Sequence, residues 1–244
     1  MDRRSLFQAS ATPGLGAVAG CCIGGLPNLS VKIVASHAGI TVGEDGGSHQ
    51  SIEDIAVMRV LPNMTVIVPA DGVETTQAIE AVAEHKGPCY VRTGRNKVPV
   101  LFGPDYRFRI GKAHVFHEGR DAAIIATGIL VAEALKARET LLAEGIDAGV
   151  INMSTIKPLD EEAVTIAAKR CGAVVTAEEH SIIGGLGSAV AEVLAESSPA
   201  PLVRIGVKDQ FGTSGEPEGL LKHYRLSAAD ICDGVKEAIR KKKR

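Results

Sequence analysis

Residues 121–152 read DAAIIATGILVAEALKARETLLAEGIDAGVIN, and this stretch decides the fold class. Residues 122–126 form a short apolar run, which is typical of a strand buried on both faces. Residues 130–143 carry apolar side chains at helical spacing, and residues 146–151 form a second apolar run. A strand, a helix and another strand in this order predict a parallel βαβ unit.

The same alternation continues on both sides of this unit. We expect further strands over 31–34, 64–68, 89–91, 173–176 and 202–205, and helices over 51–60, 72–86, 160–170, 187–196 and 228–241. Ser51 can cap the helix over 51–60, with Asp54 three residues on as in a capping box. The sequence therefore predicts an α/β protein with two parallel-type sheets.

Domain organisation follows from where this pattern fails. A chain of 244 residues is long enough for one large or two modest domains. Residues 94–120 lose the alternation and are rich in Gly, Pro, Arg and Lys, apart from a possible short strand at 113–116. We expect a Gly-rich segment over 1–27, a first domain over 28–100, a linker over 101–120 and a second domain over 121–244.

Composition excludes several classes of protein. The chain has 27 Lys and Arg against 29 Asp and Glu, a formal charge of −2, which rules out a chain-wide electrostatic nucleic-acid binder. Its five cysteines form no C-x-x-C pair, so free thiols in a reducing compartment, and hence a cytoplasmic location, are expected. No stretch has the ~20 strongly apolar residues of a membrane-spanning helix.

The N-terminal segment leaves three interpretations open. No charged residue occurs between Arg4 and Lys32. Arg3 and Arg4 ahead of an apolar stretch are similar to a twin-arginine signal, and residues 18–21 are similar to a lipoprotein cleavage site. The third interpretation, which we favour, is a Gly-rich segment that is poorly ordered or partly folded onto its neighbour.

Residues 36–50, SHAGITVGEDGGSHQ, contain the densest group of chemically active side chains. They follow a predicted strand, and ligands bind at the carboxyl ends of parallel strands. His37 and His49 can move protons near neutral pH, while Glu44 and Asp45 can accept hydrogen bonds from substrate hydroxyls. Two alternatives remain: a metal site, which lacks a compact H-x-x-x-H, and a loop whose histidines only cap neighbouring elements.

A second motif, residues 184–187 (GGLG), precedes the helix predicted over 187–196. A helix N-terminus can hold a phosphate group. The motif lacks the full G-x-G-x-x-G and a matched acidic residue, so close packing of helix on sheet is the favoured interpretation.

These motifs together resemble the transketolase family. The resemblance rests on residues 37–50 and extends from about residue 27 to about residue 240. It includes residues 52–55, 59–66, 69–71, 90–95, 154–160, 178–180, 184–187 and 211–212. It is closest to the C-terminal chain of transketolases that are split over two polypeptides.

The resemblance implies both a fold and an activity. The fold would be part of a thiamine-diphosphate pyrimidine-binding domain followed by the three-layer α/β/α C-terminal domain. The activity would be transfer of a two-carbon ketol unit between sugar phosphates. Thiamine diphosphate and Mg²⁺ would be held mainly by a partner chain with the diphosphate-binding domain. A homo-oligomer is expected, with no nucleic acid and no membrane as partner.

Site residues carry over position by position. His37 and His49 would contact the substrate near the reacting carbonyl and its phosphate and serve as the catalytic pair. Asp45 would accept a hydrogen bond from a sugar hydroxyl, and Arg95 would bind the sugar phosphate, because a guanidinium can contact two oxygens at once. An exposed linker charge is the alternative for Arg95.

The sequence also departs from the family pattern. The family activates its cofactor with a glutamate well before the histidine motif, but residues 1–43 contain no Glu, and Asp2 is the only carboxylate before Glu44. The family also stacks the pyrimidine on aromatic rings, and Phe7 is the only aromatic residue before Tyr90. A non-catalytic interaction module is therefore a second hypothesis. A third is a related enzyme, deoxyxylulose-phosphate synthase or a 2-oxo acid dehydrogenase beta subunit, against which residues 41–46 argue.

Overall fold

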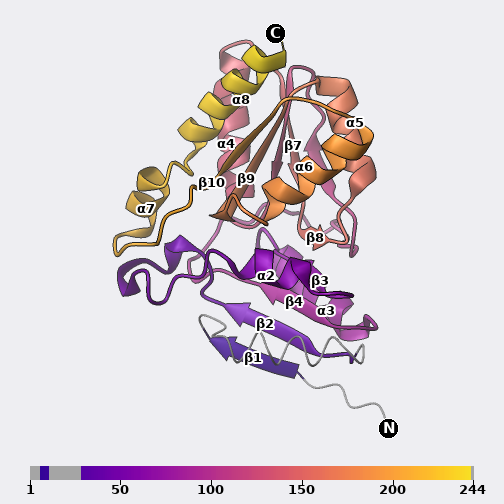
Figure 1. Cartoon of the computed structure of the whole chain (residues 1–244), viewed down its shortest axis with the longest axis vertical. Coiled ribbons are helices and arrows are strands. Elements are labelled where there is room, and N and C mark those ends of the chain that lie inside the picture. Colours follow the sequence, from indigo (N-terminus) through magenta and orange to yellow (C-terminus); the bar gives the residue numbers. More distant parts are fainter. Residues whose placement is uncertain (1–5, 11–28, 243–244) are drawn as a thin grey trace.

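A computed structural model describes residues 6–10 and 29–242, and arranges them as two sheets, one above the other along the long axis (Figure 1). The C-terminal sheet has the order β10-β9-β6-β7-β5 and the N-terminal sheet the order β1-β2-β4-β3-β8. Neighbouring strands run parallel except for β5 on β7 and β8 on β3, which are antiparallel. The predicted α/β class with two parallel-type sheets is confirmed, with one antiparallel edge strand in each.

The C-terminal sheet lies between two pairs of helices. Its strands are β5 (His114–His117), β6 (Ala122–Ala126), β7 (Ala148–Asn152), β9 (Val174–Ser181) and β10 (Leu202–Val207). Helices α4 (Leu130–Ala143) and α8 (Ala228–Lys242) cover one face, and α5 (Glu161–Cys171) and α6 (Leu186–Ser197) cover the other. This arrangement is the three-layer α/β/α domain that the resemblance implied.

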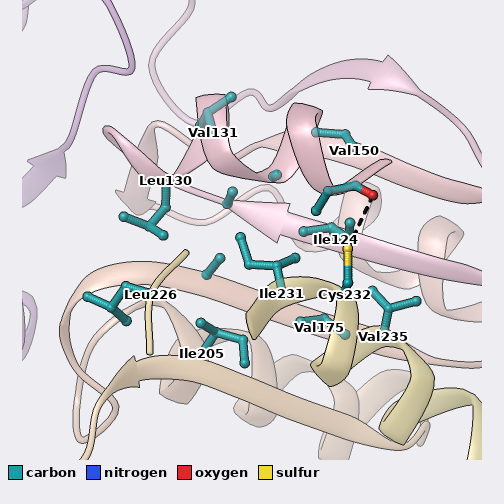
Figure 2. Close-up of a cluster of buried hydrophobic side chains, with 14 of the residues drawn as sticks. Ile124, Leu130, Val131, Val150, Val175, Ile205, Leu226, Ile231, Cys232 and Val235 are labelled. Carbon is teal, nitrogen blue, oxygen red and sulfur yellow. Dashed lines mark hydrogen bonds between the residues drawn. The ribbon is translucent and has the colours of Figure 1, made fainter. Parts of the chain in front are cut away.

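One part of the core of this domain lies between the sheet and the α4–α8 pair (Figure 2), and another lies under α5 and α6. Ile124 on β6 and Val175 on β9 meet Leu130 and Ile231 from the two helices, and all four side chains are fully buried. Burial of one such side chain contributes about 1.5–3 kcal/mol. The Cys232 thiol donates a hydrogen bond to the Ala137 carbonyl over 3.5 Å, which joins α8 to α4.

The N-terminal sheet takes its last strand from the other half of the sequence. Its strands are β1 (Leu6–Ser10), β2 (Lys32–Ser36), β4 (Cys89–Arg92), β3 (Thr65–Ile67) and β8 (Thr155–Lys157). Helix α2 (Asp54–Val60) packs on one face and α3 (Gly72–Glu84) on the other. Because β8 pairs with β3 in the register Val66–Lys157, the two halves of the chain share one sheet.

The segment expected to be a linker, residues 101–120, is packed against both halves. The backbone N–H groups of Leu101 and Phe102 donate to the Asp71 carboxylate at the start of α3, over 2.7 and 3.1 Å. Phe102 and Phe108 are buried, and β5 forms the edge of the C-terminal sheet. Because these contacts join residues that are distant in sequence, no local periodicity in the sequence predicts them.

The expected segment over residues 1–27 lies outside the described residues except for β1, whose backbone pairs with β2. The possible signals at Arg3–Arg4 and at residues 18–21 also lie outside them. Across residues 6–10 and 29–242, no helix has both the length and the apolar character needed to cross a membrane.

Candidate functional site

The loop that carries both predicted histidines begins where β2 ends. Gly39 precedes the short 3₁₀ helix η1 (Ile40–Asp45) and Gly43 lies inside it; both have a φ of 88°, a region that favours glycine. The Gly39 N–H donates to the Ser51 carbonyl over 2.8 Å and closes the base of the loop. The prediction that Ser51 caps the following helix was wrong: α2 begins at Asp54, because Ser51 pairs with Gly39.

Three contacts from the C-terminal half hold this loop in place. The Gln50 amide donates to the carbonyls of Ile40 and Thr213, over 2.9 Å in each case. The Thr41 N–H donates to Glu179 Oε1 over 2.7 Å, and Glu179 lies on β9. Helix α7 (Pro217–His223), which the sequence did not predict, also packs against η1.

Asp45 and Arg95 are brought together. Arg95 Nη1 donates to Asp45 Oδ2 over 2.7 Å and to the Val42 carbonyl over 2.9 Å. The Arg95 and Asp45 side chains are 44% and 49% exposed, so a ligand in solvent can reach both. The neighbouring Asn96 amide donates to the Thr41 carbonyl over 2.8 Å, which fixes the backbone that carries Arg95 to η1.

His37 and His49 stand at the two ends of the loop. His37 has a φ of 65°, and its Nδ1 lies 2.9 Å from Ser36 Oγ. His49 is exposed, and its Nδ1 lies 3.0 Å from Ser48 Oγ. Within the described part of the chain, neither ring forms a hydrogen bond with Asp45 or Arg95. The structure therefore joins the two residues expected to bind substrate, while each imidazole pairs with its neighbouring serine.

Sequence reasoning missed a cluster of buried charged groups beneath this loop. Arg92 on β4 donates from Nε to Asp54 Oδ2 over 2.8 Å, and Tyr90 Oη donates to the same oxygen over 2.6 Å. His180 Nε2 lies 4.0 Å from Asp54 Oδ1. Burial alone would raise the pKa of Asp54, but the Arg92 charge, His180 and these hydrogen bonds outweigh burial and lower it. The resemblance covers these positions, in residues 52–55, 90–95 and 178–180, but assigned none of them a role.

Glu178, on the same strand as Glu179, closes the N-terminus of α6. Its two carboxylate oxygens accept from the N–H groups of Leu186 and Gly187 over 2.7 and 2.8 Å. Burial raises the pKa of Glu178 to about 7, against the opposing effect of those two N–H groups. Because this carboxylate fills the helix N-terminus, the GGLG motif serves close packing of helix on sheet rather than a phosphate cradle; a Cβ on Gly185 would meet Glu178 itself.

The described residues offer no set of side chains that could bind a metal ion. No group of three or more His, Cys, Asp and Glu side chains within residues 29–242 could hold a metal ion. These residues therefore do not provide the donor set that a divalent cation needs.

Comparison with known proteins places this geometry in a family. The profile of the transketolase pyrimidine binding domain matches residues 22–100, and that of the transketolase C-terminal domain matches residues 111–231. A Methanocaldococcus jannaschii protein, provisionally described as a transketolase C-terminal section, is 50% identical over 88% of this chain and 68% of its own length. The chain belongs to the transketolase family. The sequence-based recognition of transketolase is confirmed, and transketolases generally use thiamine diphosphate.

Other relatives are named as transketolase subunits. The 6-deoxy-6-sulfo-D-fructose transketolase subunit SqwH of a Clostridium species is 46% identical over 88% of this chain and 66% of its own length. A subunit of the apulose-4-phosphate transketolase of Phocaeicola vulgatus is 38% identical over 87% of this chain and 68% of its own length. The chain thus spans about two thirds of the length of these curated relatives.

Solved structures agree with this fold. A split gene transketolase, described as an inactive beta4 tetramer, superposes with a TM-score of 0.83 at 52% identity, over 88% of this chain and 69% of that one. A Pichia stipitis transketolase superposes with a TM-score of 0.77 at 24% identity, over 93% of this chain and 33% of that one, and shows the fold alone.

Proposed function

We propose that this chain is the substrate-binding subunit of a split transketolase, which transfers a two-carbon ketol unit between sugar phosphates. The observation that carries the proposal is the exposed pairing of Asp45, within the histidine loop, with Arg95. A guanidinium there can bind a phosphate through two oxygens, and the carboxylate can accept from a sugar hydroxyl. His37 and His49 would donate protons to the oxygen that becomes an alkoxide in the transition state.

The cofactor would be thiamine diphosphate with Mg²⁺, held mainly by a partner subunit that carries the diphosphate-binding domain. The subunit names of the relatives from Clostridium and Phocaeicola support this division of labour. The cofactor, when bound, supplies the carbanion that carries the two-carbon unit. The residues of this chain bind and orient the sugar phosphate and hold protons at the reacting oxygens.

We also propose that the chain forms a homo-oligomer, with no nucleic acid and no membrane as partner, and acts in the cytoplasm. The description of the split relative as an inactive beta4 tetramer supports both self-association and the need for a partner. Free, buried thiols at Cys89, Cys171 and Cys232 support a reducing compartment. Sedimentation over a concentration series tests the oligomer, and a single monomeric species at high micromolar concentration would contradict it.

A coupled ketol-transfer assay tests the activity. The chain, thiamine diphosphate and Mg²⁺ are combined with and without the N-terminal subunit of a split transketolase. We expect no turnover from the chain alone, turnover with the partner, and a loss of about 10²–10⁴-fold in the His49→Ala variant. Robust turnover by the chain alone would overturn the partner requirement. No turnover with the partner would favour the non-catalytic interaction module.

A further inference from the structure

The buried Glu179 has no part in the chemistry proposed above, although it touches the loop that performs it. Its side chain is 2% exposed, and Oε1 accepts from the Thr41 N–H over 2.7 Å. Thr41 lies in the N-terminal half and Glu179 on β9 of the C-terminal sheet. The N–H groups in the first turn of a helix lack partners within the helix. A carboxylate from the C-terminal half therefore accepts a hydrogen bond from the first turn of η1.

The shape of the loop is built around this carboxylate. A Cβ on Gly39 would collide with all three atoms of the Glu179 carboxyl group. Gly39 also has a φ of 88°, which other residues rarely adopt. The Gly39 backbone thus approaches the Glu179 carboxylate more closely than any other residue would allow. The position of η1 therefore depends on the position of this carboxyl group.

Arg92 ties the other end of the loop to the same strand. Its Nη2 donates to the Glu179 carbonyl over 2.9 Å and to the Ser51 carbonyl over 3.1 Å. The Ser51 carbonyl also accepts from Gly39 N–H, which closes the base of the loop. Burial raises the pKa of Glu179, and the Arg92 charge and the hydrogen bond from Thr41 act against this rise. Both ends of residues 39–51 are thus fastened to β9.

We propose that Glu179 is a positioning residue of the substrate loop: its carboxylate holds η1 so that Asp45, at the end of η1, meets Arg95. This inference deepens the proposed function, because the loop it positions is the one assigned to sugar-phosphate binding. Loss of the carboxylate leaves the Thr41 N–H unpaired in a buried site, and the loop regains the freedom to leave β9.

Amide hydrogen exchange on the full chain tests the positioning directly. We expect Glu179→Ala to speed exchange across residues 39–50 by at least about tenfold, which corresponds to the loss of one charge-assisted hydrogen bond. Glu179→Gln keeps an oxygen acceptor and should stay within about threefold of the wild type. Glu178→Gln is the matched control, since Glu178 is equally buried on the same strand but binds Leu186 and Gly187. Unchanged loop exchange in Glu179→Ala, or an equal increase in the control, would overturn the proposal.

Two further measurements separate this inference from the proposed function. Inorganic phosphate titrated into the chain by calorimetry should bind at least about tenfold more weakly to Glu179→Ala, and Glu179→Gln should restore the affinity. In the complex with the N-terminal subunit, kcat/KM should fall about a hundredfold in Glu179→Ala and recover in Glu179→Gln. If the wild type binds no phosphate and turns over no substrate, the proposed function fails, while hydrogen exchange still decides the positioning. If Glu179→Ala does not fold, Glu179→Asp takes its place. This variant draws the carboxylate back by one methylene and must show faster exchange across residues 39–50.

Discussion

The Arg95 guanidinium lies 2.7 Å from the Asp45 carboxylate, so the two side chains assigned to substrate binding neutralise each other. Arg95 also donates to the Val42 carbonyl, which keeps its charge at the end of η1. Both of these hydrogen bonds start from Nη1, so within residues 29–242 the Nη2 and Nε groups of Arg95 stay available to a phosphate. The exposed ion pair contributes only about 0–1 kcal/mol, and a guanidinium–phosphate fork is stronger, so the pair opposes a ligand only weakly.

Replacement of Arg95 by Lys should weaken sugar-phosphate binding about tenfold. Lysine keeps the charge but loses the planar fork that contacts two oxygens at once. Calorimetric titration of the chain with ribose 5-phosphate measures the change. Arg109→Lys, at an exposed arginine in the segment between the halves, is the matched control and should bind like the wild type. Equal affinities for Arg95→Lys and the wild type would remove Arg95 from the phosphate site.

The Asp45→Asn variant should bind inorganic phosphate up to about fivefold more tightly, because it frees the Arg95 guanidinium from an exposed pair. The gain should disappear in 1 M salt, where charges are screened within about 3 Å. Ketol transfer in the complex should fall at the same time, since the hydroxyl acceptor is weakened. Phosphate affinity that does not respond to the substitution at low salt would show that the pair does not compete with the ligand.

Two glycines with positive φ separate backbone strain from the contact with Glu179. Gly145 has a φ of 81° and open space where a Cβ would stand, so Gly145→Ala should cost about 1–2 kcal/mol of unfolding free energy from strain alone. Gly39→Ala adds a collision with the Glu179 carboxyl group. It should cost more in urea denaturation and should also speed hydrogen exchange in residues 39–50. An equal loss of unfolding free energy in the two variants would mean that the loop accommodates the Cβ without a collision with Glu179.

Glu178 should make stability fall as the pH rises. Its folded-state pKa of about 7 lies above its ordinary value of 4.5, so the folded state holds its proton more tightly than the unfolded state. The favourable contribution is complete below about pH 4.5 and is lost as the pH rises to about 7, on the order of 3 kcal/mol in total. Glu178→Gln removes this dependence. The unfolding free energy of Glu178→Gln relative to the wild type should therefore increase between pH 5 and pH 8, and a constant difference would contradict the shifted pKa.

The core between α4 and the C-terminal sheet should be sensitive to truncation at Leu130. Leu130 is fully buried, and Leu130→Ala should lower the unfolding free energy by about 2–5 kcal/mol. Leu142 lies on the same helix but is 52% exposed, so Leu142→Ala should cost much less. Chemical denaturation of both variants measures the contrast. A similar loss for both would place Leu130 outside the cooperative core.

The fold was predictable where its signals are local. The strand over 122–126 and the helix over 130–143 match β6 and α4 at both ends, because period and apolar content are properties of the segment itself. The start of α2 was not predictable, since Ser51 is engaged by Gly39 across the loop. Strand β8 also escaped prediction, because three residues become a strand only by pairing with β3.

The candidate site divides in the same way. The sequence by itself determined the family and supplied His37, Asp45, His49 and Arg95 as candidate site residues, because a motif of fixed spacing points to residues without their coordinates. Only the tertiary structure decided that Asp45 pairs with Arg95 and that Glu179 holds the loop from β9. The physical reason is burial. A glutamate on a strand becomes a support for a distant loop only when folding removes water and leaves one N–H as its partner.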